Sequence, residues 1–110
     1  MRSILTLGAL FISAHCMAQT GNVNDLAAAA ELVKVNGCYS CHAAAEKIVG
    51  PAFKDIAAKY KDDKDAVASL AQSIQYGSKG KWGRVPMPPH ATLSGGDLKA
   101  LAGWVMATPQ

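Results

Sequence analysis

The sequence predicts an all-α fold of about four helices in one small domain. Apolar residues recur three and four positions apart in separate segments, which is the spacing of one helix face. No segment alternates convincingly between apolar and polar residues, as a half-buried strand would. The chain has 110 residues, about the size of a single domain, so a two-domain enzyme is excluded.

The first helix is predicted at residues 24–36, a stretch rich in helix formers. Asn24 can cap its N-terminus, Asp25 places a negative charge in its first turn, and Gly37 ends it. Its packing face is expected at Leu26, Ala30 and Val33.

Two more helices are predicted at residues 52–60 and 65–76. The polar residues 61–64 separate them, and Gly77 ends the second. Their apolar residues fall at helical spacing: Phe53, Ile56, Ala57 and Tyr60, then Val67, Leu70, Ala71 and Ile74.

Residues 77–93 contain three glycines and three prolines and are predicted to form a long loop. Long loops in compact domains usually serve a function. Ser94 follows as the N-cap of the last helix, with Asp97 completing a capping-box pattern. The packing surface of this helix is expected at Leu98, Leu101, Ala102, Trp104 and Val105.

Residues 1–18 have the pattern of a secretory signal peptide, which leaves 19–110 as the mature domain. A basic Arg2 precedes an uncharged run at 4–13, and small residues precede Gln19. The run is short for a membrane span, which takes about 20 apolar residues. Cys16 suggests a lipoprotein as the alternative, but His15 stands before it, where a small residue is normally needed. We expect export to the periplasm without a membrane anchor.

The charge balance excludes one class of partner. The chain has 11 Lys and Arg against 8 Asp and Glu, a net charge of +3, and removal of Arg2 lowers it further. A nucleic-acid-binding domain would be more basic, with clustered Lys and Arg. We expect no nucleic-acid partner, and we expect a monomer.

The most specific motif is Cys38-Tyr39-Ser40-Cys41-His42, the C-x-x-C-H pattern of covalent attachment of a c-type haem. In a helical turn the first, fourth and fifth residues lie on one face, so both thiols can bond the haem vinyl groups while His42 faces the iron. The predicted export agrees, because bacteria attach this haem outside the cytoplasm.

Three other interpretations of the two cysteines compete: a structural disulfide, a thioredoxin-type redox pair and half of a zinc site. Zinc needs about four ligands, and the mature chain offers only the motif and a distant His90. A redox pair should lie near a βαβ pattern, and none is visible. The haem interpretation is therefore preferred.

Three residues are candidates for the second axial ligand of the iron. Met106 lies at the end of an apolar helix face and is better explained as packing. Met87 lies between prolines, which restrict the backbone and present its thioether rigidly. His90 is the main rival, but Pro88 and Pro89 make it hard for both side chains to reach one iron, so we prefer it as a neighbouring or surface histidine.

An iron with two protein ligands cannot readily bind a substrate, so the remaining chemistry is outer-sphere electron transfer between redox proteins. A haem enzyme or sensor whose Met87 dissociates is the alternative, and a haem-free thiol protein is a third. Basic residues could surround the haem edge and steer an acidic partner: Lys34, Lys47, Lys54, Lys59, Lys79, Lys81 and Arg84.

The sequence resembles the small class I bacterial cytochromes c of the c551/c552 type over most of the mature chain. The matching residues are 37–38 and 41–42, 49–55, Gly77-Ser78-x-Gly80-x-Trp82-Gly83, 86–89, and Leu101-Ala102-x-Trp104-Val105. The resemblance implies one covalent haem wrapped by four helices. It also implies that His42 and Met87 are axial ligands, that the Pro51 carbonyl accepts a hydrogen bond from His42, and that Trp82 donates to a haem propionate. It further implies that the terminal helices cross near Gly37, where a missing side chain permits close approach, and that Trp104 joins this packing.

Two positions depart from the family pattern. Many relatives carry Asn in place of His90, where the amide helps orient the methionine ligand. Relatives also carry a basic residue near Ser73 that pairs with a propionate, which Ser73 cannot do.

Overall fold

The computed structural model describes residues 23–110, which contain four α-helices and one 3-10 turn joined by loops. The predicted signal peptide lies outside these residues. The helices are α1 (Val23–Val35), α2 (Phe53–Tyr60), α3 (Ala66–Tyr76) and α4 (Gly95–Met106), and the 3-10 turn η1 (Cys38–Ser40) follows α1. The all-α prediction is confirmed, and the predicted helix boundaries lie within about a residue of the observed ones. Because α1 begins at Val23, Asn24 is its second residue and not its N-cap, contrary to the prediction.

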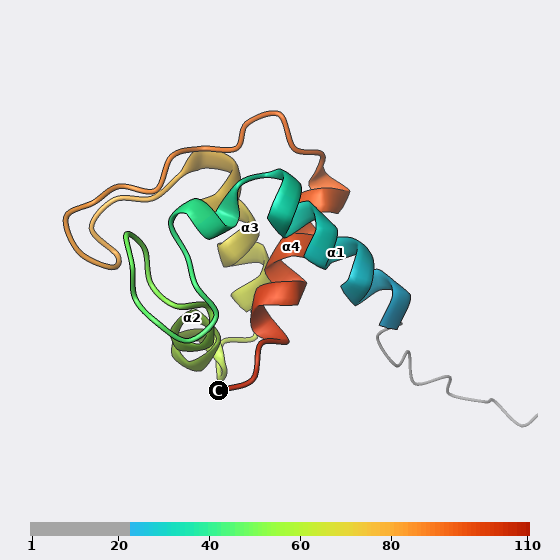
Figure 1. Cartoon of the computed structure of the whole chain (residues 1–110), viewed down its shortest axis with the longest axis horizontal. Coiled ribbons are helices and arrows are strands. Elements are labelled where there is room, and N and C mark those ends of the chain that lie inside the picture. Colours follow the sequence, from blue (N-terminus) through green and yellow to red (C-terminus); the bar gives the residue numbers. More distant parts are fainter. Residues whose placement is uncertain (1–22) are drawn as a thin grey trace, which may run out of the picture.

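The last helix, α4, organises the packing because it contacts α1, α2 and α3 (Figure 1). Its start is fixed by Ser94, whose Oγ accepts a hydrogen bond from the Asp97 N–H at 3.1 Å, as the capping pattern predicts. The buried core takes residues from all four helices: Val33, Phe53, Ile56, Leu70, Leu101, Ala102 and Val105.

The predicted packing face of α1 is wrong at one end. Ala29 and Val33 are buried, but Leu26 is 40% exposed. Four consecutive alanines at 27–30 give no contrast between the faces of this helix, so the apolar pattern could not fix which face packs against α4.

The expectation of a close approach at Gly37 is also wrong. A side-chain carbon added there would meet only Ser40 Oγ, at 3.8 Å, so the space beside this glycine is open. The terminal helices α1 and α4 do pack together, as expected. Gly37 instead has the left-handed backbone conformation, with φ 69° and ψ 23°, which ends α1 and starts η1.

Residues 77–93 form the predicted loop, which extends from the end of α3 to the start of α4 beside the 43–50 segment (Figure 1). One antiparallel bridge closes it, with Ser78 N–H donating to the Met87 carbonyl at 3.1 Å and Met87 N–H donating to Ser78 at 2.9 Å. Among residues 23–110, no helix is long and apolar enough to cross a membrane.

Candidate functional site

The C-x-x-C-H motif forms one tight helical turn. The N–H groups of Cys41 and His42 both donate to the Cys38 carbonyl, at 3.2 and 2.9 Å. Both cysteines are free and half-buried, and burial raises the pKa of the Cys38 thiol. The turn therefore presents two unpaired sulfurs and one imidazole from five consecutive residues.

His42 is held by a single hydrogen bond to the next segment. Its Nδ1 lies 2.7 Å from the Pro51 carbonyl oxygen, the contact that the resemblance implies. A carbonyl oxygen can only accept, so Nδ1 is the donor of this bond and Nε2 is the nitrogen left to face a metal. The ring also lies so close to Gly50 that an added side-chain carbon would be 2.7 Å from His42 Cε1. A glycine at 50 is what allows the backbone to pass the imidazole.

Phe53, at the start of α2, connects the motif to the core. Its ring stacks on His42 at 5.2 Å between centroids and meets Trp104 of α4 edge-on at 5.0 Å. Tyr39 of the motif meets the same ring edge-on at 5.9 Å. The imidazole is thus fixed by a hydrogen bond on one side and by aromatic packing on another.

Met87 lies at the base of the 77–93 loop, where the bridge to Ser78 holds its backbone. His90 N–H donates to the Ile74 carbonyl at 2.9 Å and ties the end of the loop to α3. Gly77, with φ 74° and ψ 179°, starts the loop in a conformation open only to glycine. A side-chain carbon there would collide with the Met87 carbonyl.

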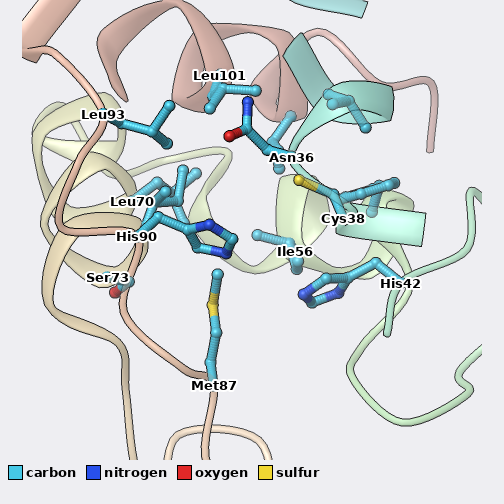
Figure 2. Close-up of a pocket in the computed structure, with 14 residues that line it drawn as sticks. Asn36, Cys38, His42, Ile56, Leu70, Ser73, Met87, His90, Leu93 and Leu101 are labelled. Atoms are coloured by element: carbon cyan, nitrogen blue, oxygen red, sulfur yellow. The ribbon is translucent and has the colours of Figure 1, made fainter. Parts of the chain in front are cut away.

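Two cavities share His42 and Met87 in their walls. The walls of the first cavity include Cys38, Ile56 and Leu70, and they are almost entirely apolar. Figure 2 shows the side chains of His42 and Met87 reaching into this space from the motif and from the loop. The second cavity is lined by Cys41, Pro51 and Trp82, among others.

All six site residues from the sequence therefore lie around these two cavities: Cys38, Cys41, His42, Pro51, Trp82 and Met87. Met106 lines neither cavity and packs against the core, as expected. His90 also lines the first cavity, with its ring near the end of Met87 (Figure 2). Sequence reasoning missed Asn36, which lines the same cavity and whose Nδ2 donates to the Leu32 carbonyl. A lone asparagine after a helix gives no signal of such a role.

The donor set fits a covalently attached haem. A mainly apolar cavity suits a large planar porphyrin, two free thiols suit thioether bonds, and an imidazole and a thioether suit the axial positions of the iron. Within residues 23–110, no group of three His, Cys, Asp or Glu side chains is placed to hold a metal ion, so the zinc interpretation has no ligand set there.

Comparison with known proteins identifies the family. The family model described as "Cytochrome c" matches residues 26–109. Cytochrome c-552 of Nitrosomonas europaea is 53% identical over 77 residues, 70% of this chain and 75% of that protein. Cytochrome c-551 of Pseudomonas denitrificans is 50% identical over 76 residues, 69% of this chain and 92% of that protein.

A solved structure agrees with the sequence comparison. The crystal structure of wild-type Nitrosomonas europaea cytochrome c552 superposes with a TM-score of 0.69 at 51% identity. The match covers 73% of this chain and 99% of that one. The chain belongs to the cytochrome c family of class I, and it is a small electron carrier, not an enzyme, with one covalently bound haem c.

Proposed function

We propose that this chain is an exported periplasmic cytochrome c that carries single electrons between two redox proteins. His42 and Met87 are its axial ligands, and Cys38 and Cys41 form the thioethers. The observation that carries the ligand assignment is that His42 and Met87 enter the same cavity from two separately anchored segments (Figure 2).

The haem, when bound, supplies an iron that alternates between Fe(II) and Fe(III). His42 offers the Nε2 lone pair, and its hydrogen bond to Pro51 keeps the ring orientation the same in both states. Met87 offers a soft thioether, which favours Fe(II) and raises the reduction potential. The loop anchors at Ser78 and Ile74 hold the thioether in place during the transfer.

The apolar walls of the cavity also raise the reduction potential. Ile56, Leu70 and Leu101 surround the site with hydrocarbon and exclude water from it. A medium of low dielectric constant disfavours the additional positive charge of Fe(III), so these walls also raise the potential.

The exposed edge of the second cavity is suited to electron entry. Val49 and Val85 line this cavity together with Cys41, and they are 50% and 64% exposed. An apolar rim of this kind lets a partner approach closely without desolvating charges. We infer that the donor and the acceptor dock here in turn.

The proposal of export rests on residues 1–18, whose basic, apolar and small-residue regions match a secretory leader. Osmotic-shock fractionation should release the haem-stained protein with the periplasmic contents. Its mass should correspond to residues 19–110 plus one haem. Retention in the membrane fraction would contradict this localisation.

The ligand assignment is tested by ferric absorption spectra of three variants. Wild type should show the weak red-end band of sulfur ligation and no reaction with added imidazole at neutral pH. Met87→Ala should lose the band and bind imidazole, because the thioether is gone. Met106→Ala is the matched control and should keep the band, since Met106 lines neither cavity.

His90→Ala separates the two loop candidates. It should keep the red-end band if Met87 is the ligand. Loss of the band in His90→Ala, or its survival in Met87→Ala, would overturn the assignment. Imidazole binding by the wild-type ferric protein would instead favour a site that opens for ligands.

A further inference from the structure

A hydrogen bond connects the two cavities across their rim. Lys81 lines the second cavity and Ser73 lines the first, and Lys81 Nζ donates to Ser73 Oγ at 3.0 Å. Ser73 lies on α3 and Lys81 lies in the 77–93 loop. The hydroxyl therefore holds an ammonium group, which would otherwise be free in solvent, at the boundary between the two cavities.

The backbone of Lys81 is held as well. Lys59 on α2 places its Nζ 4.4 Å from the centre of the Trp82 ring, a cation–π contact. The same Nζ approaches the Lys81 carbonyl at 3.5 Å, the limit of a hydrogen bond. The side chain and the backbone of Lys81 thus each have a polar contact.

The charge at this rim is unbalanced. Among the described residues that line the two cavities, Lys81 is the only lysine, and there is no arginine, aspartate or glutamate. The ion pair found within residues 23–110 joins Glu31 and Lys34 on α1, so no protein carboxylate neutralises Lys81 or Lys59 there. An ammonium group with no carboxylate partner is stabilised by an anion beside it.

A c-type haem carries two propionate carboxylates, and these are the anions that would reach this rim. We propose that Lys81 forms the ion pair with a haem propionate in this chain, and that Ser73 is the residue that positions its ammonium. This assignment rests on the proposed function, because it requires a haem in the two cavities.

The pair has a consequence for the reduction potential. An unpaired carboxylate near the iron stabilises the more positive Fe(III) state and lowers the midpoint potential. A fixed ammonium beside it cancels this effect. Lys81 therefore keeps the potential high through a charge that does not touch the iron ligands.

The test compares four variants of the haem-loaded protein. Lys81→Gln should lower the midpoint potential and move the carboxylate bending bands in the resonance Raman spectrum. Lys81→Arg should keep both near wild type. Ser73→Ala keeps the charge but loses its anchor, so it should give a smaller shift in the same direction. Lys79→Gln removes an exposed charge two residues away that lines neither cavity, and it should leave the bending bands unchanged.

The ferric red-end band separates this proposal from the proposed function. If the band is absent in wild type, the ligand assignment fails. The band can be present in every variant while Lys81→Gln and Lys79→Gln shift the midpoint potential by the same amount. In that case the proposed ion pair is wrong. Unmoved bending bands in Lys81→Gln, or a potential in Lys81→Arg as low as in Lys81→Gln, would also overturn it.

Discussion

Gly77→Ala tests the connection between the backbone of the 77–93 loop and the position of Met87. Gly77 has φ 74° and ψ 179°, a region that only glycine occupies readily. The new side-chain carbon would also collide with the Met87 carbonyl and press on the Pro89 nitrogen at 3.1 Å. The loop must therefore move at the point where it presents the thioether.

The expected loss of stability has two sources. The backbone conformation alone costs an alanine about 1–3 kcal/mol. Moving Met87 away also breaks the two hydrogen bonds with Ser78, each worth about 1 kcal/mol. The free energy of unfolding should fall by about 3–5 kcal/mol, a large part of the total for a domain of this size.

Gly80→Ala is the matched control. Gly80 also has a positive φ, 73°, but an added carbon meets no atom within 4 Å. Its cost should be the backbone conformation alone, about 1–2 kcal/mol. A loss clearly larger in Gly77→Ala than in Gly80→Ala would reflect the collision with Met87.

Guanidinium unfolding of the ferric haem protein, followed by far-ultraviolet circular dichroism, measures both losses. The red-end band, followed in the same titration, reports the sulfur ligand. Gly77→Ala should lose the band before the helices unfold, and Gly80→Ala should lose both together. Equal stabilities, or a band that persists in Gly77→Ala until global unfolding, would refute the reasoning.

Substitutions at two further positions test the core beside the site and the N-cap of α4. Phe53→Ala should destabilise the protein by about 3–5 kcal/mol in the same unfolding assay. The reason is that Phe53 is only 4% exposed and its ring contacts Tyr39, His42 and Trp104. A loss below about 1 kcal/mol would contradict this. Ser94→Ala should cost about 1 kcal/mol because it removes the N-cap of α4, and Ser94→Asp should restore that stability because its carboxylate can accept the Asp97 N–H; equal losses in both would contradict the cap.

The predictable parts of the fold are those that a few neighbouring residues decide. The helix ends at Gly37, Gly77 and Ser94 follow from local backbone and capping chemistry. The buried face of α1 does not, because Leu26 competes with a run of alanines and only contact with α4 decides which side is covered. Local signals fix where a helix begins and ends, whereas its rotation depends on its partner.

The same division applies to the site. The motif turn around Cys38 and His42 follows from residue spacing alone. The approach of Ser73 to Lys81 depends instead on how the loop folds back along α3, and the sequence provides no periodic signal for that. The sequence identified seven basic residues that could lie around the haem edge, but it could not show that Lys81 differs from the other six.

The 77–93 loop holds Met87 and Lys81 through separate contacts. Met87 is held by backbone groups of Ser78 and by the neighbouring anchor of His90 on Ile74, all at the base of the loop. Lys81 lies nearer the tip and is held by Ser73 and Lys59. Because the two sets of anchors share no side chain, the charge at position 81 can change without moving the thioether. Under the proposed ligand assignment, a substitution at position 81 should therefore change the reduction potential while Met87 stays in place.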